Sequence, residues 1–311
     1  MHKVLVGGSI AYDHIMDFPG LFKDHILPDK IESLNVSFLV NSLKKIRGGT
    51  APNIAYNLAL IGEKPMIVGT AGKDFCEYKE WLEARGVDTR YIRILEHDFT
   101  ASCFINTDLS NNQITSFYPG AMARDPEISL KALDLSEISM VVIAPTEPKA
   151  MVRWVDECQK LDIPYLYDPG MQIPRLAPGD LLKGVQGARI VVSNEYEFEM
   201  LYEKTGLKME DILNGADLCV KTLGSQGCLL RTRRESVHVP AAKPARVVDP
   251  TGAGDAFRAG LLKGYFEGAS LETMGRYANI AAVYAVEHKG AVEHSYTCDQ
   301  FMKRYRENFE K

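Results

Sequence analysis

Residues 249–257 (DPTGAGDAF) hold the side chains and spacing best suited to chemistry in this chain. They follow a strand-like segment at 245–248 and begin a predicted helix at 253–266. Small residues at a helix start let a ligand approach unpaired backbone N–H groups, and the helix dipole favours negative charge there. The segment therefore predicts an anion site, and phosphate fits it best.

Asp255 adds a second chemical group to this predicted anion site. A carboxylate at this position can cap the helix by accepting backbone N–H bonds. It can also accept the proton of an alcohol that lies beside the anion. An anion site next to a base is what phosphoryl transfer to a hydroxyl requires. The residues alone leave both roles of Asp255 open.

Two other glycine-rich segments do not match known phosphate motifs. In residues 69–74 (GTAGKD), Asp74 replaces the Ser or Thr of a Walker loop, and residues 6–11 (VGGSIA) lack the GxGxxG spacing of a dinucleotide site. The seven histidines form no metal-ligand pattern. The sequence therefore supports neither a P-loop enzyme nor a Rossmann dehydrogenase.

The composition indicates a soluble globular protein, because 46% of its 311 residues are hydrophobic and 25% are charged. A net charge of −5 repels phosphate backbones, so we expect no nucleic-acid partner. No apolar run approaches the roughly 20 residues of a membrane span, so we expect no membrane partner. The six cysteines form no CxxC pair. We interpret them as reduced thiols and expect a cytoplasmic protein.

Short apolar strands alternate with helical stretches along most of the chain, which predicts a parallel sheet covered on both faces. The expected strands are 4–8, 66–69, 91–95, 140–144, 165–167, 190–193 and 218–223. The expected helices are 50–61, 75–85, 149–160, 195–201, 253–266, 271–288 and 298–308.

Two further segments have β character and interrupt this pattern. Residues 35–40 (NVSFLV) alternate in polarity, and residues 101–106 and 113–118 flank a polar turn. We predict a lid built from 11–45 and 99–118 on an α/β body built from 1–10, 46–98 and 119–311. Ordinary hairpins at a sheet edge are the alternative.

Residues 249–257, together with residues 48–53 (GGTAPN), resemble the ribokinase-like (phosphofructokinase-B) carbohydrate and nucleoside kinases. The resemblance covers nearly the whole chain and includes residues 194–197 (NEYE) and 221–227 (KTLGSQG). Within the family, residues 34–40 (LNVSFLV) and 116–122 (SFYPGAM) look most like bacterial-type adenosine kinases. The implied fold is a three-layer α/β/α body with a small β-sheet lid.

The resemblance implies a role for each matching residue. Asp255 resembles the general base, and Gly252, Ala253 and Gly254 resemble the anion hole. The residues that resemble the substrate site are Ser9, Asp13, Ser37, Gly48, Gly49, Asn53, Phe117 and Gln172. Among them, Asp13 and Asn53 would hold the sugar diol, and Phe117 would stack on adenine. The residues that resemble the ATP site are Asn194, Thr222, Gly224, Gly227 and Asn279.

The resemblance also implies bound cations. Glu197 resembles a residue that orients Mg²⁺ through water. Asp249 resembles a ligand of a monovalent cation, usually potassium, with backbone carbonyls of Ala285, His288 and Gly290. His294 departs from the family pattern, because a small polar residue is common at its position. Cys103 is a second departure, since it replaces an aromatic partner of the base.

We therefore expect an ATP-dependent kinase that phosphorylates the 5′-hydroxyl of a nucleoside, with adenosine converted to AMP. The first alternative is a kinase for a free sugar or another nucleoside. The second is a ligand-binding protein without catalysis on the same fold, which would need no base at position 255. The expected partner is a small molecule, and the resemblance also implies a homodimer through the lid.

Overall fold

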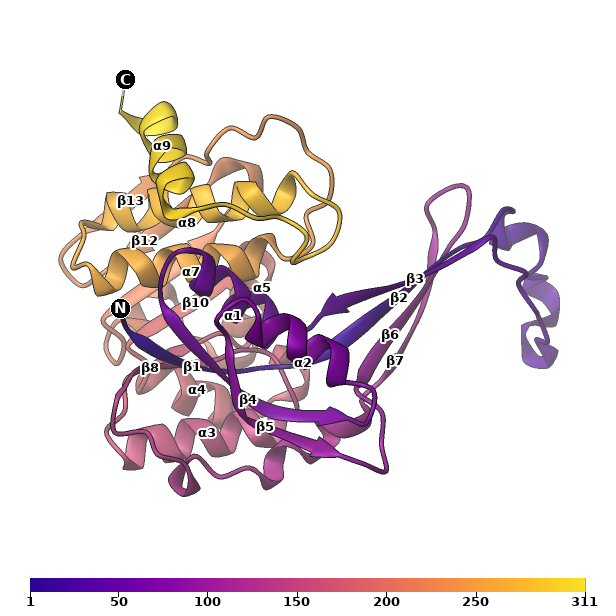
Figure 1. Cartoon of the computed structure of the whole chain (residues 1–311), viewed down its shortest axis with the longest axis horizontal. Coiled ribbons are helices and arrows are strands. Elements are labelled where there is room, and N and C mark those ends of the chain that lie inside the picture. The colour runs from indigo at the N-terminus through magenta and orange to yellow at the C-terminus, as the bar shows by residue number, and fades with distance from the viewer. Residues whose placement is uncertain (311) are drawn as a thin grey trace.

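The computed structural model describes residues 1–310 and confirms the predicted α/β/α body (Figure 1). Nine strands form its central sheet in the order β13-β12-β11-β10-β9-β8-β1-β4-β5. Their bounds are β1 Lys3–Gly7, β4 Lys64–Gly72, β5 Asp88–Leu95, β8 Ile138–Ile143, β9 Tyr165–Tyr167, β10 Ile190–Asn194, β11 Leu218–Thr222, β12 Cys228–Arg231 and β13 Ser236–Val239. The pairs from β5 to β11 are parallel, and β12 and β13 add an antiparallel edge.

Helices cover both faces of this sheet because its strands are apolar on both sides. Val4 and Val6 of β1 face one core, and Leu5 faces the other. The first core packs against α1 Thr50–Leu60, α2 Cys76–Glu83, α7 Ala253–Phe266, α8 Leu271–Val286 and α9 Cys298–Phe309. The second packs against α3 Pro148–Lys160, α4 Pro178–Gln186, α5 Glu195–Thr205 and α6 Met209–Ile212. Within residues 1–310, no helix is long and apolar enough to cross a membrane.

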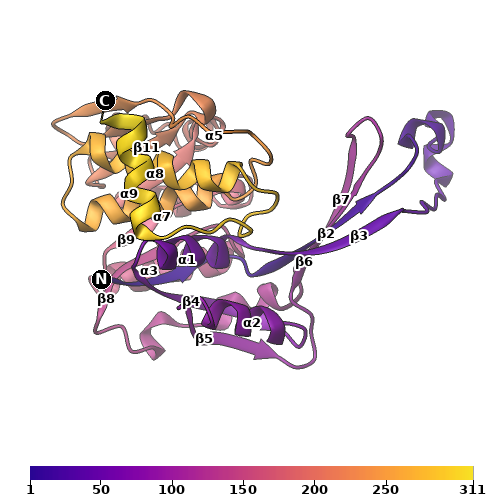
Figure 2. The same ribbon diagram turned by 45° about the horizontal axis from the view of Figure 1, so that its top comes forward.

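A second sheet projects from the body (Figures 1 and 2). Its strand order is β3-β2-β6-β7, with β2 Ala11–Asp17, β3 Ser42–Gly48, β6 Ala101–Thr107 and β7 Gln113–Tyr118. We call this sheet, with the segment 18–41 at its outer end, the lid. Its strands enter from the body at Ala11, Gly48 and Ala101, so the lid has several separate connections to the body.

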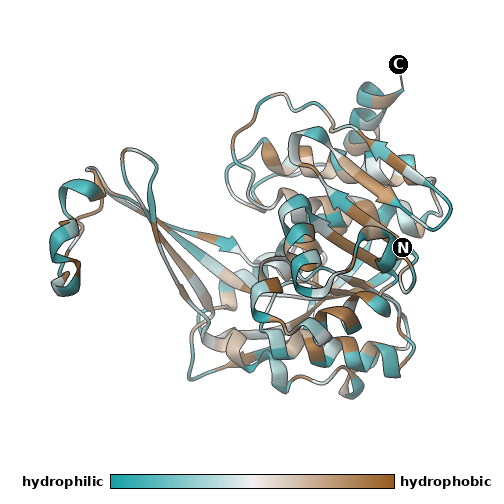
Figure 3. Ribbon diagram, turned by 180° about the vertical axis from the view of Figure 1, so that it is seen from behind, coloured by the Kyte–Doolittle hydropathy of each residue, from teal (hydrophilic) through white to brown (hydrophobic). Residues whose placement is uncertain are grey.

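The predicted strand at 35–40 is wrong. Residues 34–40 form extended coil beyond the start of β3, after the 3-10 helices η1 (Phe22–Asp24) and η2 (Pro28–Ser33). No neighbouring strand offers this segment a ladder of hydrogen bonds, so its aromatic residue packs locally instead. Phe38 stacks edge-on against Phe18 and Phe22. The helical part of this segment is mostly hydrophilic, whereas the strands of the body are hydrophobic (Figure 3).

The predicted strand at 245–248 is also wrong, since residues 240–250 form an irregular loop held by α8. Val248 and Asp249 both donate their N–H groups to the carbonyl of Val286, at 2.9 and 3.1 Å. Six helices and strands were absent from the sequence prediction: α4, α6, β2, β3, β12 and β13. The other predicted helices and body strands are present with bounds that differ by a few residues.

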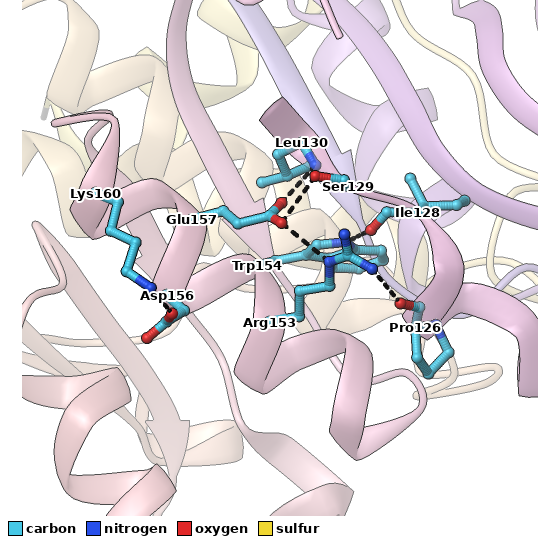
Figure 4. A network of polar contacts seen from close by, with 9 residues as sticks. All are labelled: Pro126, Ile128, Ser129, Leu130, Arg153, Trp154, Asp156, Glu157 and Lys160. Carbon is cyan, nitrogen blue, oxygen red and sulfur yellow. Dashed lines mark hydrogen bonds and ion pairs between the residues drawn. The ribbon is translucent and has the colours of Figure 1, made fainter. Parts of the chain in front are cut away.

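A polar network on α3 fixes the chain where it leaves β7 (Figure 4). The buried Glu157 carboxylate accepts hydrogen bonds from the Ser129 hydroxyl (2.8 Å), the Leu130 N–H (2.6 Å) and Arg153 Nε (2.9 Å). Arg153 also donates to the carbonyl of Pro126 at 2.8 Å. These bonds tie the end of the 3-10 helix η3 (Gly120–Glu127) and the residues that follow it to α3.

Candidate active site

The site residues gather at the carboxyl edge of the body sheet. Ser9 follows β1, Asp168 follows β9, and Asn194 and Thr222 end β10 and β11. Because parallel strands end at the same edge, these residues lie along one side of the sheet, where open α/β sheets bind ligands. The start of α7 and the base of the lid complete the same region (Figure 2).

The start of α7 presents unpaired backbone donors. Gly252 precedes the helix with φ +78°, in the left-handed region that favours glycine. A Cβ at this position would lie 2.6 Å from Ala291 Cα, so a side chain would not fit. The N–H of Ala253 donates to the carbonyl of Pro250 (3.1 Å), whereas those of Gly252 and Gly254 have no backbone acceptor among residues 1–310. Of the three residues predicted to form the anion hole, Gly252 and Gly254 have free N–H donors, whereas the N–H of Ala253 is already bonded.

Asp255 lies one turn into α7 with its carboxylate held by the first helix of the body. Asn53 of α1 donates Nδ2–H to Asp255 Oδ2 at 2.8 Å. Asn53 Oδ1 is buried and has no partner, so it can accept a hydrogen bond from a substrate hydroxyl. Burial raises the pKa of Asp255 to about 6, while Arg258 and Asn53 lower it. The carboxylate is therefore ionised at neutral pH and close to the range of an effective general base.

Asp13 of the lid approaches the same region. A Cβ on Gly48 would lie 2.7 Å from Asp13 Oδ2, so the glycine gives the carboxylate room beside the backbone. Burial raises the pKa of Asp13, and the charge of Asp249 raises it further. Ile46, which pairs with Asp13 in the lid sheet, lies close to Gly290, and the N–H of Gly290 donates to Asp249, so the lid base lies beside the loop that precedes α7.

Ser9 and Gly49 join β1 to α1. The Ser9 hydroxyl accepts the N–H of Thr50 at 3.1 Å, and the Ser9 N–H donates to Thr50 Oγ1 at 3.0 Å. Gly49 has φ +94°, and a Cβ there would lie 2.5 Å from the Ser9 carbonyl. The Ser9 hydroxyl predicted to bind substrate therefore also caps the start of α1.

One row of lid side chains shares a face with Asp13. In the register of the lid sheet, Asp13 pairs with Ile46 and Cys103, and Cys103 pairs with Phe117. Paired residues point to the same face of a sheet. Ile46 also lies close to Gly290, so this face looks toward the body. Phe117 is 51% exposed, and its ring is open to a ligand.

Ser37 is not brought to this cluster within one chain. It lies in the exposed coil at 34–40, beyond the pair Asp17–Ser42 at the outer end of the lid. Asp13 lies nearer the other end of the same strands, which joins the body at the pair Ala11–Gly48. Gln172 lies on the body side in the 3-10 helix η5 (Gly170–Arg175), where it is buried and accepts a hydrogen bond from Arg175 at 3.2 Å.

Asn194 and Glu197 form a reciprocal cap on α5. Asn194 Oδ1 accepts the N–H of Glu197, and Glu197 Oε2 accepts the N–H of Asn194, both at 2.8 Å. This Asn-x-x-Glu sequence therefore caps the start of α5. Burial raises the pKa of Glu197, and the charge of Asp168 raises it further.

The surroundings of Glu197 fit a hydrated magnesium ion. Its Oε1 has no hydrogen bond within residues 1–310, and the excess negative charge there favours a cation. Mg²⁺ retains water and commonly uses only one or two protein carboxylates beside substrate phosphates. No group of three or more acidic, histidine or cysteine side chains forms a metal cluster in the described chain.

The predicted nucleotide residues lie beside this cap. Thr222 pairs with Asn194 across β10 and β11. Gly224 (φ +57°) and Gly227 (φ +94°) shape the turn into β12, and a Cβ on Gly227 would lie 2.0 Å from the Val239 carbonyl. Asn279 of α8 is buried and donates to the Pro240 carbonyl at 3.1 Å. Asn279 therefore holds the loop after β13.

Asp249 is satisfied by backbone donors on both sides. Its Oδ1 accepts the N–H of Thr251 and its Oδ2 accepts the N–H of Gly290, each at 2.9 Å. His294 faces away toward α1, where its Nε2 is 2.8 Å from Asn57 Oδ1. Because the Asn57 Nδ2–H group donates to the Asn53 carbonyl, Asn57 Oδ1 is the acceptor and His294 Nε2 is the donor. Asp249 therefore joins the loop before α7 to the loop after α8 through its own hydrogen bonds. The His294 side chain is held by α1 and adds no ligand for a monovalent cation.

The sequence reasoning missed Arg258 and Asp168. Arg258 lies on α7 one turn after Asp255, and its Nε is 2.5 Å from Asp168 Oδ2. The available signal was an arginine three residues after the predicted base, together with an acid directly after β9. Nothing local to either residue indicates that they meet, because 90 residues separate them in the sequence.

Comparisons with known proteins find similarity over nearly the whole chain. The model of the pfkB family carbohydrate kinases matches residues 1–298. A nucleoside kinase from Methanocaldococcus jannaschii is 28% identical over 306 residues, which are 98% of this chain and 97% of the relative. The crystal structure of a nucleoside kinase from that organism superposes with a TM-score of 0.89 over 99% of both chains.

A nucleoside kinase from Burkholderia thailandensis, solved in complex with inosine, is 34% identical and has a TM-score of 0.87. The match covers 99% of this chain and 98% of that chain. A ribokinase from Bacillus subtilis is 28% identical over 297 residues, 94% of this chain and 95% of the relative.

Proposed function

Because the chain belongs to the pfkB family of carbohydrate kinases, we propose that it transfers the γ-phosphoryl group of ATP to the 5′-hydroxyl of a nucleoside, with adenosine as the preferred substrate. The observation that carries this proposal is Asp255 at a helix start with free N–H donors. Its carboxylate is held by Asn53, whose own oxygen is free for a hydroxyl. A base and an anion hole in one helical turn are the requirements of phosphoryl transfer to an alcohol.

In the proposed mechanism, Asp13 and Asn53 hold the sugar hydroxyls, and Asp255 takes the proton of the 5′-hydroxyl as it attacks. The N–H groups of Gly252 and Gly254 then stabilise the charge that develops on the transferring phosphoryl group. A magnesium ion oriented from Glu197 would neutralise phosphate charge. Closure of the lid, which carries the row that contains Asp13, onto the body would exclude water, which favours transfer to the alcohol over hydrolysis.

The lid row supports a nucleoside rather than a free sugar. Ile46, Cys103 and Phe117 extend the Asp13 face with apolar and aromatic surface, which suits a flat base attached to the sugar. A free sugar would require polar partners there. The B. thailandensis nucleoside kinase, solved with the purine nucleoside inosine, supports the same class of substrate.

The test is a coupled assay of ADP release with MgATP and adenosine, inosine, cytidine, ribose or fructose as acceptor. We expect the highest kcat/KM with adenosine. A preference for inosine or cytidine would keep the nucleoside class and replace adenosine. A preference for ribose or fructose would refute the nucleoside proposal, and transfer to none of the five would favour a ligand-binding protein.

A further inference from the structure

A buried ion pair lies directly beneath the proposed base. Arg258 is 8% exposed and Asp168 is 2% exposed, and their Nε and Oδ2 atoms are 2.5 Å apart. Arg258 also donates Nη1–H to the carbonyl of Gly254 at 2.7 Å. One guanidinium thus connects the end of β9 to the first turn of α7.

The pair is poorly explained by stability alone. Taking two charges out of water costs several kcal/mol per ion, and apolar residues of similar size often replace such pairs without loss. Asp168 Oδ1 and Arg258 Nε are both buried without a hydrogen bond, so the two groups meet as an ionic contact and each is only partly compensated. The neighbouring residues Ala256 and Ala259 of α7 are buried and apolar, whereas Arg258 lies near the carboxylates of Asp255 and Glu197 as well as that of Asp168.

The position of the pair relates it to three parts of the proposed site. Gly254, whose carbonyl Arg258 holds, supplies a free N–H of the anion hole. Asp168 begins the loop that leads to Gln172 in η5. The charges of the pair also reach Glu197, where Asp168 raises the pKa of the carboxyl group and Arg258 lowers it.

We propose that Arg258 and Asp168 are positioning residues that lock the start of α7 onto the end of β9, and so fix the anion hole and Asp255 for transfer. This inference rests on the proposed function, because it assumes that Asp255 is the base. The guanidinium suits this task, since its planar fork can bond a carboxylate and a carbonyl at once, whereas an ammonium group has no such fixed geometry.

The electrostatic part of this role has a definite sign. The charge of Arg258 lowers the pKa of Asp255, and the charge of Asp168 raises it. Removing Arg258 alone therefore raises the pKa of Asp255 and moves the acid limb of the kcat–pH profile to higher pH. Removing both charges together returns the limb toward that of the wild type.

The experiment compares Arg258→Met, Arg258→Lys and the double variant Arg258→Met with Asp168→Leu, using the best acceptor of the panel. Arg153→Met is the matched control, because Arg153 also pairs with a buried carboxylate, that of Glu157, on α3. We measure the thermal midpoint, kcat, KM for both substrates and the kcat–pH profile.

We expect Arg258→Met to lose about 100-fold in kcat, the cost of misplacing reacting groups by about 1 Å, with a smaller change in either KM. The acid limb moves to higher pH in this variant. The double variant, which leaves no unpaired buried charge, recovers the thermal midpoint and moves the limb back toward its wild-type position, but kcat stays low. Arg258→Lys recovers kcat only in part, and Arg153→Met keeps it.

Recovery of kcat together with stability in the double variant would overturn the inference, because the pair would then serve only the fold. A wild-type kcat in Arg258→Met would overturn it as well. The proposed function is judged separately, by which acceptors the wild type phosphorylates. A sugar preference leaves the inference standing, whereas transfer to no acceptor overturns both.

Discussion

Substitution of Asp255 by asparagine tests the proposed chemistry and its energetic cost in one variant. The amide oxygen of Asp255→Asn still accepts the hydrogen bond from Asn53, so the local structure is kept. The proton acceptor is lost, and general-base catalysis contributes about 10²–10⁴-fold. We therefore expect kcat to fall by at least about 100-fold, with KM for both substrates little changed.

The same variant should be more stable than the wild type at neutral pH. Burial raises the pKa of Asp255 from 3.8 to about 6. Each unit of pKa difference between the folded and unfolded states corresponds to about 1.4 kcal/mol. Ionisation of Asp255 therefore lowers the unfolding free energy of the wild type by about 3 kcal/mol above pH 6. Asparagine avoids this cost, and the figure is an upper value because the side chain is partly exposed.

The stability gain has a defined pH dependence. Below pH 4 the wild-type Asp255 is protonated in the folded and unfolded states, so its cost is absent there and appears as the pH rises from 4 to 6. Urea denaturation at pH 7.5 and pH 4.5 measures the difference, and Asp24→Asn, at an exposed acid of η1, is the control. The wild-type kcat should also fall on the acid side with a midpoint near pH 6.

Either of two results would refute this reasoning. A kcat within tenfold of the wild type would exclude Asp255 as the base. The second result is an inactive Asn variant whose gain in unfolding free energy over the wild type is no larger at pH 7.5 than at pH 4.5. It would show that ionising the Asp255 carboxylate does not destabilise the folded protein.

Three other predictions follow from the site. Gly252→Ala should lower both the thermal midpoint and kcat, because its Cβ would lie 2.6 Å from Ala291 Cα, whereas Gly179→Ala, with open space around it, should change neither in the same thermal and kinetic assays. Phe117→Ala should raise KM for the nucleoside about tenfold, since stacking on a base contributes about 1–3 kcal/mol, and leave KM for ATP unchanged. Phe104→Ala, whose ring lies on the opposite face of β6 against His14, is its control, and equal effects of both would exclude stacking by Phe117. Replacing K⁺ by Na⁺ should change kcat by less than about tenfold, or 1.4 kcal/mol, because Asp249 already joins the loops before α7 and after α8 through backbone N–H bonds. A larger loss of kcat in Na⁺ would show that a potassium ion holds these two loops.

Local sequence was sufficient for the elements whose pattern and caps lie within one segment. The helix predicted at 253–266 has those bounds in α7, since small residues before it and apolar spacing within it agree. The parallel strands of the body sheet were predicted because each contains a short apolar run that is buried, whereas the antiparallel edge strands β12 and β13 were missed. The base and the free N–H donors belong to one such element, so their proximity could be predicted.

Features that depend on a distant partner were beyond local sequence. Residues 35–40 alternate like a strand, but a strand needs a neighbour, and Phe38 finds Phe18 and Phe22 instead. Ser37 was carried to the substrate site with that segment and lies at the outer end of the lid. The contact of Arg258 with Asp168 joins α7 to β9, and no spacing within either element signals it.

The strand order of the body sheet bears on how the chain folds during synthesis. β1, the first strand made, lies in the interior of the sheet between β4 and β8, and the strands from β8 to β13 then follow in sequence order toward one edge. Domains fold as units from the N-terminus as the chain emerges, so each new strand from β8 onward finds its neighbour already present. Asp255 is synthesised after every strand of this sheet. A nascent or truncated chain that ends before α7 therefore holds every strand of this sheet, but it lacks both the proposed base and the helices α7, α8 and α9 that cover one face of the sheet.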